Sequence, residues 1–184
     1  EIPENLMPEG VSVNQIVSTW AAFAAICSDG QVRCWGNAGR GGEIPENLMP
    51  EGVSVNQIVS NGCAFAAICS DGQIRCWGDG DRGGSIPANL MPEDVSVNQI
   101  VSTAYAFAAI CSDGQIRCWG YEDWGGEIPE NLIPEGVSVN QIVSKSRAFA
   151  AICSDGQIRC WGDGDYGGEI PENLMPEGVS VNQI

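Results

Sequence analysis

Short apolar segments alternate with turn residues along this chain, and one such unit recurs throughout it. The run Ala25-Ile-Cys-Ser-Asp-Gly-Gln-Val-Arg-Cys-Trp-Gly36 holds two apolar segments joined by Ser-Asp-Gly-Gln. Asp-Gly accepts the positive φ angles that a tight turn between two twisted strands requires, so this run predicts a β-hairpin. The same hairpin returns at 67–78, 109–120 and 151–162, each time 42 residues later.

This period divides the chain into repeats at 1–42, 43–84, 85–126 and 127–168, with a partial fifth at 169–184. In the first repeat, Val11–Ser18, Phe23–Cys27 and Val32–Trp35 are expected strands, and the proline-containing residues 1–10 are expected to be irregular. The segment Ala24–Cys27 is apolar at every position, so both faces of its sheet need cover, which favours a β-propeller over a β-solenoid. We predict an all-β single domain over 1–184, with 42-residue antiparallel blades of three or four strands.

Composition and charge exclude several classes of function. Eight basic residues against 24 acidic ones give a net charge of −16, which disfavours binding to nucleic acid or to anionic membranes. The chain has no histidine, which excludes conventional histidine-dependent catalysis. The Asp-Gly-Asp runs at 79–81 and 163–165 resemble only half of a calcium loop. We predict no metal, no cofactor and no enzymatic activity, and the sequence does not indicate a compartment.

The nine cysteines form one pair per repeat, as at Cys27 and Cys34, plus Cys63 outside the pattern. A two-residue Asp-Gly turn would make the paired cysteines diagonal neighbours at about 7–8 Å, near the upper limit for a disulfide. A three-residue turn with a bulge would point them to opposite faces of the sheet. We expect free thiols that fill small gaps in the core, and the Cys-x6-Cys spacing without histidine does not favour zinc.

A family resemblance is carried by the run from Ile16 to Gly36 followed by Gly41-Gly42, with Asp-Gly-x-Val/Ile-x-x-Trp-Gly at a fixed offset in every repeat. This pattern resembles the repeat of the regulator of chromosome condensation family, including its short bacterial forms, one of which is a propeller inhibitor of β-lactamases. The resemblance implies a β-propeller, commonly of seven blades. Two features depart from the family pattern: Ala22 replaces a frequent histidine, and Gly41-Gly42 replaces a longer Gly-Gln-Leu-Gly ending. Exchange factors, inhibitors and scaffolds all use this fold, so the function does not follow from it.

Seven columns of the period vary among the repeats, whereas the remaining columns are nearly invariant. The variable columns correspond to residues 19–21 and 37–40 of the first repeat, and they hold every tyrosine and the one lysine of the chain. In an up-and-down meander the two loops that carry them share one end of the sheet, opposite the invariant Ser-Asp-Gly-Gln turn. Exposed loops on a rigid scaffold commonly carry binding residues.

We interpret the variable columns as a binding face, because tyrosine, tryptophan and arginine dominate interface hot spots. Simple drift of solvent-exposed loops is the alternative, but it does not predict aromatic residues in water. The predicted binding residues are Thr19, Trp20, Ala21, Arg40, Asn61, Asp79, Asp81, Arg82, Tyr105, Tyr121, Glu122, Asp123, Trp124, Lys145, Arg147, Asp163, Asp165 and Tyr166.

The predicted function is therefore non-enzymatic recognition of a protein or a glycan. A structural or oligomerisation scaffold is the alternative, and guanine-nucleotide exchange follows from family analogy only. Aromatic residues of the variable columns buried between blades or chains would favour the scaffold. Because an open propeller exposes sheet edges, we also expect the chain to be part of a longer ring or to complete a ring as a homo-oligomer.

Overall fold

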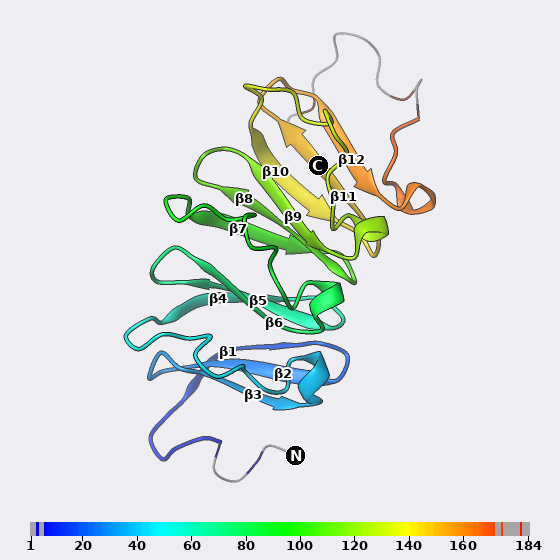
Figure 1. Ribbon diagram of the computed structural model, residues 1–184. Helices are drawn as coiled ribbons and strands as arrows, with labels where there is room; N and C mark the ends of the chain where they lie inside the picture. Colours follow the sequence, from blue (N-terminus) through cyan, green and yellow to red (C-terminus); the bar gives the residue numbers. More distant parts are fainter. Residues whose placement is uncertain (1–2, 4–5, 172–173, 175–180, 182–184) are drawn as a thin grey trace. The chain divides into compact units, whose positions relative to one another are not determined.

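In the computed structural model, which describes residues 3, 6–171, 174 and 181, each repeat forms one antiparallel three-stranded sheet, here called a blade (Figure 1). This confirms the predicted all-β propeller architecture, and within the described residues each blade has three strands and no fourth. The blades are β1 (Val13–Ser18), β2 (Ala22–Cys27) and β3 (Val32–Gly36); β4 (Val55–Ser60), β5 (Ala64–Cys69) and β6 (Ile74–Gly78); β7 (Val97–Ser102), β8 (Ala106–Cys111) and β9 (Ile116–Gly120); and β10 (Val139–Ser144), β11 (Ala148–Cys153) and β12 (Ile158–Gly162).

A short 3-10 turn follows the last strand of each blade. These turns are η1 (Ala38–Arg40), η2 (Gly80–Arg82), η3 (Glu122–Trp124) and η4 (Gly164–Tyr166). The first strand begins two residues later than predicted, at Val13, and the third extends one residue further, to Gly36. Residues 179–184 of the partial fifth repeat correspond to the predicted first strand of the other repeats. They lie outside the described residues except for Val181, whose N–H donates to the Gly156 carbonyl at 2.9 Å.

The blades belong to two compact units. Unit 1 spans Glu1–Ile86 and holds blades 1 and 2, and unit 2 spans Pro87–Ile184 and holds blades 3 and 4. A single domain over 1–184 therefore stays a prediction. Within the described residues, no helix is long and apolar enough to cross a membrane.

The hairpin between the second and third strands has the longer of the two turns considered. Ile26 pairs with Val32, and the Cys27 N–H donates to the Gln31 carbonyl at 2.9 Å, which leaves a three-residue Ser-Asp-Gly loop. Gly30 closes this loop at φ 79°, a left-handed conformation that favours glycine. Cys27 and Cys34 therefore lie on opposite faces of the sheet, and all nine cysteines are free thiols. Burial raises the pKa of the Cys34 thiol to about 12, so it behaves as a small apolar core residue.

An ion pair between aspartate and arginine stabilises each hairpin turn. In blade 1, Arg33 donates to both carboxylate oxygens of Asp29, at 3.0 and 2.6 Å, while the Gln31 N–H also donates to Asp29. The same Asp–Arg pair recurs at equivalent positions of the other three blades. The hydrogen bonds from Arg33 lower the pKa of Asp29 to about 2, and those from Arg159 lower the pKa of Asp155 to about 2.

These pairs predict a specific loss of stability in acid. A carboxyl whose pKa is lower in the folded than in the unfolded chain stabilises the fold above its unfolded pKa of about 3.9, and loses that effect as the pH falls towards about 2. Urea midpoints measured at pH 7, 4 and 2 should therefore fall less steeply below pH 4 in a variant with Asp29→Asn and Asp155→Asn than in the parent. Asparagine keeps an oxygen for the Gln31 and Gln157 amides, so equal slopes in the two proteins would contradict the prediction.

The core of unit 1 forms between its two sheets. Small residues of β2, Ala22 and Ala24, lie opposite the large side chains of blade 2, Phe65 and Trp77. Phe65 and Trp77 are cross-strand partners whose rings stack at 5.2 Å, and they are 0% and 1% exposed. The Trp77 indole N–H donates to the Gly41 carbonyl at 3.1 Å, which ties blade 2 to the end of η1.

Unit 2 repeats this junction with the same residue types. Ala106 and Ala108 of β8 lie in one core cluster with Phe149 and Trp161 of blade 4. The Phe149 and Trp161 rings stack at 5.2 Å, and the Trp161 indole donates to the Gly125 carbonyl at 3.2 Å. The invariant columns therefore build one apolar junction twice.

Candidate binding surface

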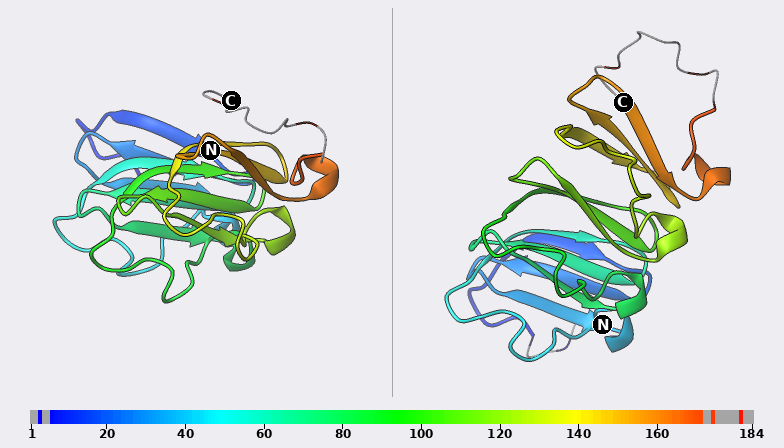
Figure 2. Two further views of the ribbon diagram at one scale, coloured as in Figure 1. Left: turned by 90° about the horizontal axis from the view of Figure 1, so that it is seen from above. Right: turned by 45° about the horizontal axis from the view of Figure 1, so that its top comes forward.

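The two variable loops of each blade lie side by side at one end of the sheet. In blade 1 the Asn37 N–H donates to the Ala21 carbonyl at 2.9 Å, and the Thr19 hydroxyl donates to the Arg40 carbonyl at 3.0 Å. Equivalent backbone bonds join the loops in the other three blades. Within each unit, the η turns lie at the same end of the two sheets (Figure 2).

The first variable column supports the loops in three of the blades. Thr19, Asn61 and Thr103 are 9%, 6% and 3% exposed. The Asn61 amide donates to the Arg82 carbonyl at 2.7 Å, and the Thr103 hydroxyl donates to the Trp124 carbonyl at 3.0 Å. These side chains join the two loops of their own blade, and their burial leaves little of them accessible to a ligand.

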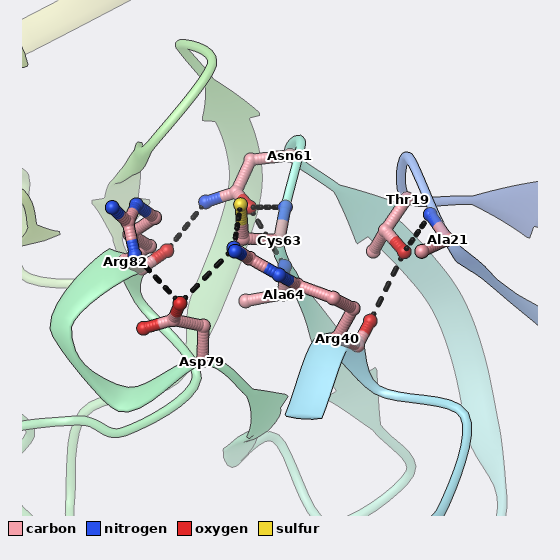
Figure 3. Close-up of polar contacts among 8 residues, drawn as sticks. All are labelled: Thr19, Ala21, Arg40, Asn61, Cys63, Ala64, Asp79 and Arg82. Atoms are coloured by element: carbon pink, nitrogen blue, oxygen red, sulfur yellow. Dashed lines mark hydrogen bonds and ion pairs between the residues drawn. The ribbon is translucent and has the colours of Figure 1, made fainter. Parts of the chain in front are cut away.

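A charged cluster lies at the variable loops of unit 1 (Figure 3). Arg40 of blade 1 and Arg82 of blade 2 both donate to the same oxygen of Asp79, at 3.0 and 2.7 Å. Arg40 also contacts the sulfur of Cys63. Burial raises the pKa of the Cys63 thiol, although the two guanidinium groups oppose that shift, so the thiol is protonated at neutral pH.

An aromatic cluster occupies the equivalent place in unit 2. The Tyr105 and Trp124 rings stack at 4.3 Å with an interplanar angle of 1°. The Arg147 guanidinium lies 4.3 Å from the Trp124 ring and 4.3 Å from the Tyr166 ring. Tyr121 contacts Tyr105 and Trp124 edge-on, at 6.5 and 5.8 Å. Much of the predicted aromatic set is therefore packed within the unit.

Fewer residues of the variable loops are exposed than the predicted binding set contains. The half-buried members are Arg40, Asp79, Arg82, Tyr105, Trp124, Arg147 and Asp163, and the exposed members are Trp20, Ala21, Asp81, Tyr121, Glu122, Asp123, Lys145, Asp165 and Tyr166. Trp20 is 68% exposed, and Tyr121 and Tyr166 are each 42% exposed. The tips of η2, η3 and η4 expose carboxylates, and in blades 3 and 4 an exposed tyrosine belongs to the same loop as these carboxylates.

Sequence reasoning missed an apolar surface on blade 1. Val13, Ile16 and Phe23 are 47%, 55% and 45% exposed. Their counterparts Ile58 and Phe65 in blade 2 are 2% and 0% exposed, because blade 1 covers them. These columns are nearly invariant, so the sequence carries no signal that separates the exposed copy from the buried one.

The acidic loops do not form a metal site within the described part of the chain. No group of three or more cysteine, aspartate or glutamate side chains lies close enough there to hold a metal ion. Asp163 instead accepts the backbone N–H of Asp165 at 3.0 Å and caps η4.

Comparisons with known proteins agree with this architecture. The chain matches 96% of its length to the crystal structure of yeast RCC1 (Prp20) bound to Kap60, with a TM-score of 0.62 and 19% identity, covering 48% of that chain. Prp20p of Saccharomyces cerevisiae, described for its binding properties to Gsp1p and histones, gives a TM-score of 0.62 at 19% identity over 96% of this chain and 50% of that one. The ectodomain of the Arabidopsis thaliana receptor kinase ACR4 gives a TM-score of 0.59 at 18% identity, and the match covers 85% of this chain and 55% of that one.

These likenesses define a β-propeller built from repeated blades, and the chain spans about half the length of the solved structures that it matches. Residues 139–167 match the family model described as the regulator of chromosome condensation (RCC1) repeat. The matched residues lie within the fourth repeat, which is therefore similar to the RCC1 repeat, and the other repeats have nearly the same sequence. No curated protein matches it in sequence.

Proposed function

We propose that this protein is a non-enzymatic recognition propeller that binds a protein partner through the exposed tips of its variable loops. The observation that carries the proposal is the combination of exposed aromatic rings and exposed carboxylates in the variable loops of blades 3 and 4, with an exposed Trp20 in blade 1 and an exposed Asp81 in blade 2. Tyr121 and Tyr166 offer large contact areas, whereas Asp81, Glu122 and Asp165 offer negative charge. Aromatic residues supply contact energy at interfaces, and charge complementarity supplies specificity and speed of association.

The charge of these tips favours a basic protein segment over a neutral glycan. Three of the four η turns carry an acidic residue at an exposed position, and the whole chain has a net charge of −16. The aspartate of the invariant turn at the opposite end of each blade is paired with arginine, as in the Asp71–Arg75 pair at 2.6 Å. At the variable end Asp79 and Asp163 are paired with arginine as well, so the exposed negative charge there comes from Asp81, Glu122, Asp123 and Asp165. The solved neighbours support a protein partner in general terms, since yeast RCC1 was crystallised with Kap60 bound.

Selective neutralisation of the loop tips tests this proposal. The tip variant carries Asp81→Asn, Glu122→Gln, Asp123→Asn and Asp165→Asn, and the matched control carries Glu46→Gln, Glu51→Gln, Glu130→Gln and Glu135→Gln. All eight positions are exposed, so both variants lose the same charge without disturbing the core. Proteins captured from an extract of the source cells by the immobilised chain are identified, and their affinity for each variant is measured. We expect binding by the tip variant to weaken by about tenfold or more, and the control to stay within about twofold.

Equal loss of binding in both variants would mean that the partner responds only to the net charge of the chain, and it would contradict recognition by the tips. Retention of the same partners by both variants would contradict it as well. Two observations favour the scaffold alternative: Trp124 packs against Arg147 of the following blade, and blade 1 has an exposed apolar face that includes Ile16 and Phe23. Light scattering from the purified chain and from the tip variant tests assembly through this face. The capture experiment separates the two functions, because a homo-oligomeric ring is compatible with either, whereas loss of partners from the tip variant alone is expected only for recognition.

A further inference from the structure

The invariant core of this protein does not distinguish one blade from another. Each unit contains one complete junction between blades, and both junctions pack a Phe–Trp stack against alanines of the preceding sheet. The stacking distance is 5.2 Å in both, and in both the tryptophan donates to a glycine carbonyl of the preceding blade. A chain built from the invariant columns alone would therefore pair any blade with any other.

Junctions that are interchangeable create a folding problem. Repeats of nearly identical sequence form wrong pairs and exchange elements between chains, because the wrong arrangement buries the same apolar surface as the right one. Proteins resolve such degeneracy with residues that stabilise one pairing and destabilise its competitors. Outside the variable columns the two core clusters differ by apolar exchanges of similar size, Val32 against Ile116 and Met49 against Ile133, so the charged and aromatic residues of the variable columns are the main difference between the junctions.

The variable side chains at the junction of unit 1 are matched by charge. Arg40, at the end of η1 in blade 1, reaches across to Asp79 of blade 2 at 3.0 Å and also contacts Cys63 (Figure 3). The side chains of Arg40 and Asp79 are 35% and 18% exposed, so this pair is partly shielded from solvent. Cys63 is fully buried and small, which leaves room for the arginine beside it.

The junction of unit 2 uses the same columns with different chemistry. Trp124, at the end of η3 in blade 3, occupies the column of Arg40, and Arg147 of blade 4 occupies the column of Cys63. The Arg147 guanidinium lies over the Trp124 ring at 4.3 Å, and it donates to Asp163 of its own blade at 3.3 Å. A cation over an aromatic ring thus replaces the ion pair seen in unit 1.

We propose that these columns identify the neighbour of each blade: the residue that ends an η turn recognises the loop of the following blade through a matched pair. The two pairs are not interchangeable. Arg40 opposite an arginine at position 63 would place a third guanidinium beside Asp79, which already accepts Arg40 and Arg82. Trp124 opposite a cysteine at position 147 would lose its cation. The variable columns therefore select the correct order of blades, in addition to any role at the exposed tips.

A swap that preserves composition tests the proposal. The mismatched variant carries Cys63→Arg and Arg147→Cys, so that the whole chain keeps its residues and its net charge while both junctions become non-cognate. A second mismatched variant carries Arg40→Trp and Trp124→Arg. The rescue variant carries all four changes, which moves each matched pair to the other junction. The residue at 79 and 163 is aspartate in both blades and is left in place.

Each protein is unfolded in urea, refolded under reducing conditions at several concentrations, and analysed by size-exclusion chromatography with light scattering. We expect both mismatched variants to unfold at lower urea and to refold with a severalfold larger fraction of exchanged oligomers than the parent. The rescue variant should recover the elution profile of the parent. Its loss in urea midpoint should be smaller than the sum of the losses in the two mismatched variants. If each residue acted independently of the residue opposite it, the two pairs of changes would be additive. Additive effects, or mismatched variants that refold like the parent, would overturn the proposal.

Discussion

Replacing Phe65 by alanine is expected to lower the free energy of unfolding of unit 1 by about 3–5 kcal/mol. Phe65 is fully buried between the two sheets of the unit and stacks on Trp77. Alanine would leave a cavity that the surrounding β2 alanines are too small to fill. Urea unfolding followed by circular dichroism measures the loss, and native-state hydrogen exchange of the β4–β6 amides assigns it to this unit.

The same column offers a matched control in blade 1. Phe23 has the same neighbours in sequence and stacks on Trp35 in the same way, at 5.3 Å, but it is 45% exposed. Phe23→Ala therefore removes mainly the stacking contact, and the expected cost is about 1 kcal/mol. Equal losses for Phe23→Ala and Phe65→Ala would contradict the burial difference between the two blades.

This contrast shows what the sequence can and cannot determine about the fold. The four Asp-Gly turns at a constant spacing predict the hairpins, their order and the repeated sheets, because turn chemistry and local strand patterns act over a few residues. The sequence does not separate Phe23 from Phe65, because their repeats are almost identical. Only the presence of a packed neighbour separates them, and that property belongs to the tertiary structure.

The turn length shows a similar limit at a smaller scale. Asp-Gly is compatible with a two-residue or a three-residue turn, and the two alternatives place Cys34 on different faces relative to Cys27. The structure has the three-residue turn, in which Asp29 accepts the Gln31 N–H at 3.1 Å and Gly30 adopts a positive φ. The interaction that favours this turn joins a side chain to the backbone two residues later, and a pattern of apolar positions does not reveal it.

The candidate site was predictable in its position and only partly in its members. The alternation of turns in a meander brings the two variable loops of a blade together, and the Asn37–Ala21 hydrogen bond shows this contact. Variation alone does not tell whether a side chain faces solvent or the next blade. Arg40 faces its neighbouring blade and Trp20 faces solvent, although both belong to variable columns. Pairwise contacts between repeats, which no single repeat encodes, decide the difference.

A second large effect is expected where η1 meets blade 2. Gly41 ends this turn at φ 93°, and a Cβ atom at this position would lie 2.5 Å from the Phe65 ring and 3.4 Å from the Trp77 ring. Gly41→Ala therefore combines an unfavourable left-handed backbone with a clash in the core of unit 1. Its carbonyl also accepts the Trp77 indole N–H, so a displacement of the turn weakens that bond as well. We expect a loss of about 2–5 kcal/mol in the free energy of unfolding, measured by urea titration.

Gly167 separates the two causes, because it occupies the same column with the same φ of 93° and no described atom lies within 4 Å of its added Cβ. Gly167→Ala should show the backbone cost alone, about 1–2 kcal/mol. The difference between the two variants then measures the clash with the Phe–Trp stack. If Gly41→Ala and Gly167→Ala cost the same, the close approach of the glycine to that stack contributes nothing. The glycine at the end of each η turn would then be required for its backbone conformation and not for the packing of one blade on the next.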